Sequence, residues 1–279
     1  MKPFLYVIFT PEAYIDAKAR YLSRMKNLIL LIALILVSQQ AHSHNEGHKD
    51  LRDGNIERVY PGKGKIVLTF DDGPNKKSTP KILETLRQYN VKATFFVLGK
   101  LANRYPELMS QIEKEGHIIA NHSYEHNNIG NFSKWGLKKK LKKSFFEAHE
   151  ALAPYTSNTD QWFFRAPYGS WQSKASKIIN KTEVGKDYIG PVLWDIGGNI
   201  RKDENGIYQE AADWGCWSQG LTIDECLEGY INRTDYRKGG VILMHDIHAK
   251  SATMLTKLIP ALLEKGYTFI NLDEVGLTK

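Results

Sequence analysis

The chain has 279 residues, with 38 Lys and Arg against 31 Asp and Glu, and only two cysteines. Hydrophobic residues make up 42% and charged residues 25%, which excludes a disordered chain, a collagen-like repeat and a disulfide-stapled miniprotein. The formal net charge is +7, of which residues 1–43 contribute +3 through five basic and two acidic residues. The remaining +4 is modest, so the sequence predicts no nucleic-acid partner.

An apolar run near the N-terminus is typical of an export signal. Leu28–Val37 follows the basic residue Lys26, and Ala41–Ser43 places small residues two apart. This pattern predicts a signal peptide within residues 1–43, with Met25 as a possible true start. Ten residues are too few to cross a bilayer as a helix, which needs about 20. We expect a periplasmic or secreted protein without a membrane span after cleavage; a retained anchor or a core helix is the alternative.

The exported part divides into a polar lead-in, residues 44–59, and one domain, residues 60–279. In that domain, short apolar segments alternate with amphipathic helical ones, which indicates an α/β barrel or doubly wound sheet. The predicted strands are Ile66–Phe70, Ala93–Leu98, His117–Ala120, Trp162–Arg165, Pro191–Ile196, Gly239–Met244 and Tyr267–Ile270. The predicted helices are Thr79–Tyr89, Pro106–Glu115, Lys134–Leu152, Thr222–Arg233 and Ala252–Lys265. Residues 197–220 are predicted to form an irregular loop, and long loops in compact domains often serve function.

The two cysteines, Cys216 and Cys226, both lie in the exported part. We expect a disulfide between them in an oxidising compartment; two free thiols are the alternative. Their spacing matches no zinc pattern.

Polar side chains follow several of the predicted strands. They are Asp71 and Asp72, His122 and His126, Arg165, and His245. In an α/β barrel, residues just past the carboxyl ends of the strands converge on one mouth. The sequence therefore predicts a polar site there, although each residue alone also fits a turn, a cap or the core.

The spacing of His122 and His126 would let both imidazoles face one metal ion from a helical turn. Chance pairing is the alternative. A carboxylate from Asp71 or Asp72 would complete a site with two histidines and one carboxylate. The other aspartate would remain free as a base. Asp-Asp-Gly-Pro is otherwise an ordinary turn sequence.

Four motifs occur in order along the chain: Thr69–Pro74, His122–His126, Arg165–Gly169 and Leu243–His245. Together they resemble the motifs of the polysaccharide deacetylases, the fourth carbohydrate esterase family with the NodB homology domain. The likeness spans roughly residues 65–271. It implies a single domain with a distorted (β/α) barrel of fewer than eight strands, and a divalent metal, usually zinc.

The resemblance also implies the role of each motif residue. Asp71 would be the general base and His245 the general acid. Arg165 would orient Asp71, the backbone N–H of Tyr168 would help to bind the oxyanion, and Leu243 would border the pocket for the acetyl methyl group. The implied metal ligands are Asp72, His122 and His126. Attack of water on the amide carbonyl would then release acetate and a free amino sugar.

The fourth motif of the family departs from its pattern in this chain. An aspartate is usual beyond a tryptophan, where it supports the catalytic histidine. If Trp194 is that tryptophan, the aspartate position holds Gly197. Asp195 or Asp246 would have to serve instead.

Further residues are candidates for contact with a glycan, because aromatic rings stack on sugar faces. They are Trp171, Trp194, Trp214 and Trp217. Packing in a small satellite core is the alternative for Trp214 and Trp217. The lysines of residues 134–152 are read as a solvated face, with contact to an anionic cell wall as the alternative.

We therefore expect a monomeric, exported, metal-dependent N-deacetylase of N-acetylhexosamine polymers, acting on peptidoglycan. Alternative substrates are chitin, poly-N-acetylglucosamine and O-acetylated xylan. A catalytically degenerate glycan-binding protein and a metal-free structural envelope protein are alternatives of other classes.

Overall fold

The structure of the protein, a computed structural model, describes residues 59–275. The predicted signal peptide, its possible start at Met25, and nearly all of the polar lead-in lie outside them. Within the described part, no helix is both long enough and apolar enough to span a membrane.

A parallel sheet forms the centre of the domain. Its order is β3 (Ile118–Asn121), β2 (Thr94–Val97), β1 (Lys65–Asp71) and β8 (Gly240–His245). The short β9 (Thr268–Phe269) pairs with the start of β1. β2 and β3 are buried throughout, and β1 and β8 nearly so. Near-continuous burial is expected of parallel strands with both faces covered, and it explains their unbroken apolar sequences.

Isolated bridges extend the parallel order past both edges of this sheet. Asn121 bridges to Phe164, just after β4 (Trp162–Phe163), which pairs in parallel with β5 (Tyr188–Ile189). On the other edge, Ile196 bridges to Ile242 of β8. The predicted α/β class with a single domain is confirmed.

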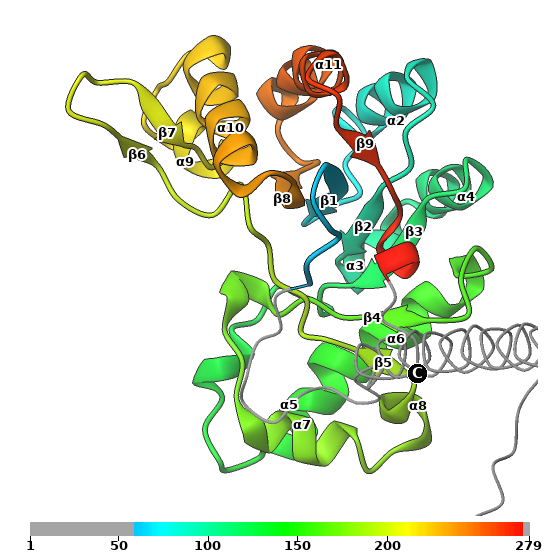
Figure 1. Cartoon of the computed structure of the whole chain (residues 1–279). Helices are drawn as coiled ribbons and strands as arrows, with labels where there is room; N and C mark the ends of the chain where they lie inside the picture. The colour runs from blue at the N-terminus through cyan, green and yellow to red at the C-terminus, as the bar shows by residue number, and fades with distance from the viewer. Residues whose placement is uncertain (1–58, 276–279) are drawn as a thin grey trace, which may run out of the picture. The chain divides into compact units, whose positions relative to one another are not determined.

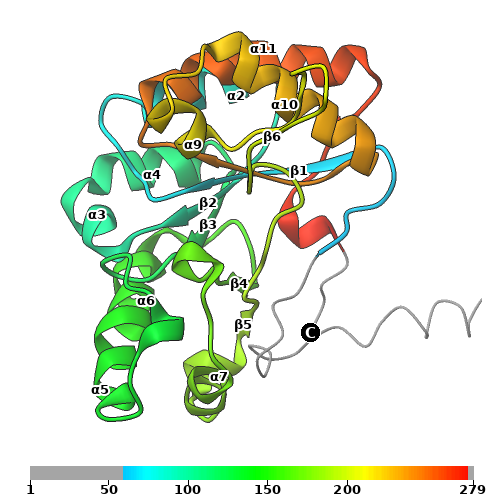
Figure 2. The same ribbon diagram turned by 90° about the vertical axis from the view of Figure 1, so that its left-hand side faces the viewer.

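The helices lie on both sides of these strands. Figures 1 and 2 show α2, α10 and α11 on one side of the β1–β8 sheet, with α5 and α7 on the other side of the domain. The main helices are α2 (Thr79–Gln88), α3 (Gly99–Arg104), α4 (Pro106–Lys114), α5 (Leu137–Leu141), α6 (Glu147–Leu152), α7 (Ser173–Ile179), α8 (Glu183–Lys186), α9 (Asp213–Ser218), α10 (Ile223–Arg237) and α11 (Ala249–Glu264). A π-helical turn, η2 (Lys142–Phe146), joins α5 to α6. The 3₁₀ turns are η1 (Ile129–Asn131), η3 (Ala153–Tyr155), η4 (Pro167–Gly169) and η5 (Leu272–Val275).

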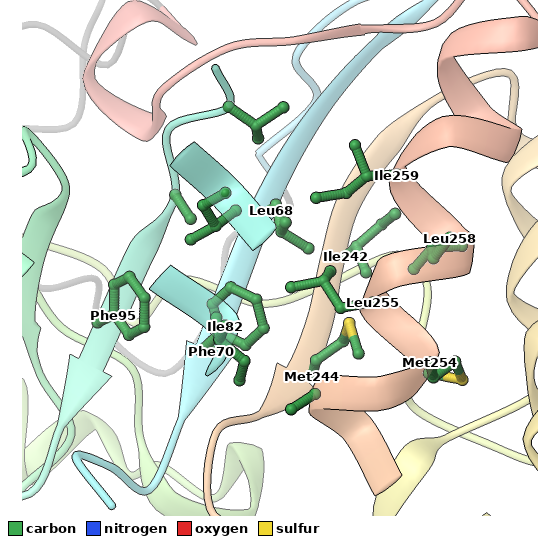
Figure 3. Close-up of a cluster of buried hydrophobic side chains, with 14 of the residues drawn as sticks. Leu68, Phe70, Ile82, Phe95, Ile242, Met244, Met254, Leu255, Leu258 and Ile259 are labelled. Carbon is green, nitrogen blue, oxygen red and sulfur yellow. The ribbon is translucent and has the colours of Figure 1, made fainter. Parts of the chain in front are cut away.

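The largest core cluster fixes the strands that carry the site. Leu255 and Ile259 of α11 lie one helical turn apart, are buried and point toward β1 and β8 (Figure 3). Phe70 and Met244, one residue before the ends of β1 and β8, belong to the same buried cluster. Full burial of each such side chain contributes about 1.5–3 kcal/mol. The ends of both strands are therefore held by packing directly beneath the polar site.

Three predicted elements differ from the structure. Pro191–Ile196 is not a strand: β5 ends before Pro191, which has no N–H for a ladder, and only Ile196 bridges to β8. The predicted helix 134–152 begins at Leu137, after Gly136 in the left-handed region with φ 70°. Residues 197–220 are more regular than predicted, because they contain the hairpin β6 (Arg201–Lys202) and β7 (Tyr208–Glu210), followed by α9.

The predicted disulfide is present and joins α9 to α10. Cys216 and Cys226 are both buried, with their Cα atoms 5.9 Å apart. The bridge closes a loop with a sequence separation of 10 residues.

Replacing both cysteines with alanine is expected to lower the free energy of unfolding by about 2–3 kcal/mol, because a loop of this length becomes free in the unfolded chain. Urea unfolding of the oxidised protein and the double variant measures the difference. Reduced wild-type protein is the matched control and should unfold near the variant. Equal midpoints for the oxidised and reduced protein would show that the bridge does not stabilise the fold.

Candidate active site

Polar side chains gather where parallel strands end, as the sequence predicts. Asp71 ends β1 and lies opposite His245, which ends β8. His122 directly follows β3, and Arg165 follows β4. The carboxyl ends of parallel strands share one edge, so these residues meet there. They surround a cavity of about 420 Å³, lined by Asp71, Asp72, His122, His126, Tyr168, Trp194, Gly198, Trp214, Leu243, His245 and His248.

The loops around this cavity hold strained backbone. Six non-glycine residues in the described chain have positive φ, and four of them are Asp72, Ser123, His126 and Tyr168. Such conformations cost of order 1–3 kcal/mol each and persist where the surroundings impose them, most often at functional sites. Asp72 and His126 both have this strained backbone, and their side chains lie close together.

The three predicted metal ligands form one cluster. The Nε2 atom of His126 lies 3.1 Å from Oδ1 of Asp72, and Nε2 of His122 lies 3.4 Å from the same oxygen. The ligand atoms of all three residues lie within 4.8 Å of one another. Oδ1 of Asp72 is buried and has no hydrogen-bond partner in the described chain. A buried oxygen without a donor, facing two imidazole nitrogens, fits a site for a divalent cation.

The protonation states favoured in this cluster are those that bind a metal ion. Burial alone would raise the pKa of Asp72, but the neighbouring His122 and His126 hold it well below its ordinary value. Burial lowers the pKa of His126, which favours the neutral imidazole. An ionised carboxylate and neutral imidazoles are the forms that bind metal.

Backbone contacts orient the first histidine. Nδ1 of His122 lies 2.9 Å from the carbonyl oxygen of Arg165. A carbonyl can only accept, so Nδ1 carries the hydrogen and Nε2 presents its lone pair to Asp72. This arrangement is the usual one for a metal-binding histidine.

Arg165 holds Asp71 in place. The guanidinium is fully buried and donates from one nitrogen to Oδ1 of Asp71 at 2.7 Å. The same nitrogen donates to Thr69 Oγ1 at 2.8 Å, and Nε donates to the carbonyl of Val192 at 3.0 Å. The second oxygen of Asp71 faces His122, at 3.6 Å from Nε2. Arg165 thus fixes one carboxylate oxygen and leaves the other toward the metal cluster.

The partner of His245 is Asp213, which the sequence analysis did not identify. Nδ1 of His245 lies 2.7 Å from Oδ1 of Asp213, and its backbone N–H donates to Oδ2 at 2.8 Å. Ser251 also donates to Oδ2, at 2.6 Å. Burial alone would lower the pKa of His245, but the buried Asp213 carboxylate raises it to about 9. This pKa favours the protonated imidazole at neutral pH.

The carboxylates of both predicted substitutes for the fourth-motif aspartate have other partners. Asp195 pairs with Arg237 at 2.6 Å, and Asp246 accepts a hydrogen bond from Thr79 at 2.6 Å. Asp213, which pairs with His245 in their place, begins α9, beyond the β6–β7 hairpin. No sequence signal singles out Asp213, because its pairing with the aromatic Trp214 also occurs at Trp194 and Asp195.

The predicted aromatic contacts divide into two groups. Trp194, Trp214 and Leu243 line the cavity, as does the exposed ring of Tyr168. Trp171 and Trp217 do not line it. Each indole donates to a serine, Trp171 to Ser176 at 2.8 Å and Trp217 to Ser251 at 2.9 Å, and both rings pack against hydrophobic clusters. His248, which no motif indicated, also lines the cavity.

In this parallel α/β fold, a His-His-Asp cluster thus lies beside a carboxylate and an Asp-paired histidine. A family model described as polysaccharide deacetylase matches residues 58–185. A peptidoglycan-N-acetylglucosamine deacetylase of Bacillus cereus is 32% identical over 227 residues, covering 77% of this chain and 70% of that protein. The chain belongs to the polysaccharide deacetylase family.

Other relatives carry related names. A chitooligosaccharide deacetylase of Azorhizobium caulinodans is 27% identical, covering 77% of this chain and 95% of that protein. A solved structure of a peptidoglycan N-acetylglucosamine deacetylase matches with a TM-score of 0.62 at 30% identity, covering 80% of this chain and 92% of that one. The chain spans only 38% of the length of its relatives from Listeria monocytogenes.

Proposed function

We propose that this protein is a metal-dependent N-deacetylase that removes acetyl groups from the N-acetylhexosamine residues of peptidoglycan. One observation carries the proposal. A cluster of three possible metal ligands, Asp72, His122 and His126, lies in one cavity with a carboxylate, Asp71, and an Asp-paired histidine, His245. Hydrolysis of an amide needs a base for water, a site for the oxyanion and an acid for the leaving amine.

Asp71 acts as the general base. Arg165 holds one of its oxygens, so the other stays aimed at the cavity and takes the proton from the attacking water. The backbone N–H of Tyr168, at the cavity wall, is proposed to stabilise the oxyanion. Leu243 bounds the space for the acetyl methyl group.

His245 acts as the general acid. Its Nδ1 is engaged by Asp213, so Nε2 is the nitrogen that gives a proton to the departing amine. The raised pKa, about 9, keeps that proton available at neutral pH. Acetate and a free amino sugar are the products.

Asp72, His122 and His126 would hold the cation, and this mixture of imidazole and carboxylate ligands suits zinc. When bound, zinc would act as a Lewis acid on the acetyl carbonyl.

Peptidoglycan is favoured as the substrate because several relatives are named as its deacetylases, including one at 32% identity. Chitin-type oligomers are the second candidate, because a chitooligosaccharide deacetylase is also similar. O-acetylated xylan has no such support. The degenerate glycan-binding alternative depended on a missing aspartate, and Asp213 occupies that role. Export directed by the signal in residues 1–43 would bring the protein to the peptidoglycan. We infer that it acts there as a monomer.

Removing the metal is expected to abolish acetate release from peptidoglycan, because the oxyanion loses its main electrostatic partner. Protein dialysed against a chelator is assayed for acetate and for new free amines, before and after zinc is restored. The variant His126→Ala should bind metal more weakly by about 10-fold or more, since it loses one of three protein ligands. Undiminished acetate release by metal-free protein would overturn the proposed mechanism.

A further inference from the structure

A basic groove lies on the part of the domain formed by α5 and α7, outside the catalytic cavity. It encloses about 470 Å³ and is lined by Lys134, Gly136, Leu137, Lys138, Lys174, Lys177 and Ile178. Four of these seven residues are lysines, and none of the seven carries a carboxylate. Leu137 is buried in a hydrophobic cluster with Leu141, Phe145 and Ile179, so packing fixes the base of the groove.

The positive charge of the basic groove is concentrated. A hydrogen bond with the side chain of Lys134 lowers the pKa of Lys174, and the like charges of Lys134 and Lys177 lower it further. An adjoining hollow shares Lys138 with the basic groove and adds Lys139, Lys142 and Lys181, although Glu150 and Glu183 also line it. Crowded lysines repel one another, and a bound anion relieves that repulsion.

Both segments that line the basic groove follow closely, along the chain, residues that line the catalytic cavity. Lys134 follows the cavity residue His126 by eight positions, and Lys174 follows Tyr168 by six. Six residues of extended chain span at most about 20 Å, which limits the separation of Tyr168 and Lys174. The two loops are also tied together, since Gly130 N–H donates to Ser170 O at 3.2 Å and Gln172 Nε2 donates to Ile129 O at 2.6 Å. Figures 1 and 2 show α5 and α7 side by side.

An exposed aromatic side chain lies next to the groove in the chain. Trp135 is 90% exposed and directly follows Lys134. An indole in water next to a cluster of lysines is a suitable contact for a partner that is partly apolar and negatively charged.

We propose that the basic groove binds the carboxylates of the peptides that peptidoglycan carries, while the glycan strand occupies the catalytic cavity. This rests on the proposed function and deepens it, because chitin has no carboxylates and would gain nothing from the groove. The groove would therefore make the enzyme prefer peptide-bearing glycan.

The test compares two soluble glycans of equal length prepared from peptidoglycan, one with its peptides and one stripped of them by an amidase. Hydrolysis leaves a lactyl carboxylate on the sugar, so the two glycans differ in the carboxylates that the peptides themselves carry. The full chain, loaded with zinc, is assayed for acetate on both, at low and at high salt. The variant combines Lys134→Gln, Lys138→Gln and Lys174→Gln. A matched control combines Lys63→Gln, Lys81→Gln and Lys114→Gln, three exposed lysines outside the groove.

The groove variant is expected to lose about tenfold in kcat/KM on the peptide-bearing glycan, mainly through KM, with little change on the stripped glycan. The control should keep the wild-type preference, and added salt should weaken that preference in the wild type. Equal losses on both glycans, or none on either, would overturn the groove proposal while leaving the deacetylase function intact. Absence of acetate release by wild-type protein from both would instead contradict the proposed function.

A third arm measures binding to vesicles of phosphatidylglycerol and phosphatidylcholine. Loss of vesicle binding in the groove variant, with unchanged preference for peptide-bearing glycan, would assign the groove to a lipid surface and overturn the proposal.

Discussion

Replacing Asp71 with asparagine is expected to lower kcat by about 10²–10⁴-fold, the usual contribution of a general base. Asparagine has nearly the same shape and can still accept the hydrogen bond from Arg165, but it cannot take a proton from water. Zinc binding should persist, because the proposed ligands are Asp72, His122 and His126. Acetate release and zinc content are measured on the same samples.

The matched control for this variant is Asp195→Asn. Asp195 is also buried and also pairs with an arginine, Arg237, but it does not line the cavity. Both variants leave an arginine without its charged partner and should unfold at lower temperature than the wild type. Only Asp71→Asn should lose activity at a temperature where both are folded. Equal activity of the two variants would rule out Asp71 as the base.

Replacing Asp213 with asparagine is expected to lower the pKa of His245 from about 9 toward its ordinary value of 6.5. The carboxylate that raises this pKa most is lost, while burial still lowers it and the carboxylates of Asp71 and Asp72 still raise it. A general acid works only while protonated, so wild-type activity persists until the pH rises through the pKa of His245. In the variant this loss occurs at lower pH, and at pH 7.5 the protonated fraction is reduced by up to about tenfold.

Nuclear magnetic resonance titration of the metal-free protein measures the pKa of His245 directly, and pH–rate profiles measure its consequence for catalysis. Ser251→Ala is the comparison variant, since it removes one hydrogen bond to Asp213 and keeps the carboxylate. It should leave the pKa of His245 above 6.5. An unchanged His245 pKa in Asp213→Asn would show that this pair does not set the proton affinity of the acid.

The general position of the site could be predicted because it depends on local patterns and one topological rule. The apolar segments that end at Asp71, Asn121 and His245 can be recognised in the sequence as buried strands. Parallel strands place their carboxyl ends at one edge, so residues that follow them meet without further information. The contact of Arg165 with Asp71 follows from the same rule, since β4 joins that series through the bridge from Asn121 to Phe164.

The partner of His245 could not be predicted from such patterns. Asp213 reaches the site from a short helix after a hairpin, and its place depends on how α9 packs on β8 and on the Cys216–Cys226 bridge to α10. No periodic pattern of apolar residues in the sequence indicates this position of Asp213. The same reason explains Trp217, whose indole turns to Ser251 rather than to the cavity.

The most direct test is acetate release from intact peptidoglycan by the zinc-loaded protein, with Asp71→Asn as the inactive comparison. We expect zinc-dependent release by the wild type, one new free amine for each acetate, and almost none by the variant. No release by a protein that holds zinc at full occupancy, from peptidoglycan or from chitin oligomers, would contradict the deacetylase function proposed for this site.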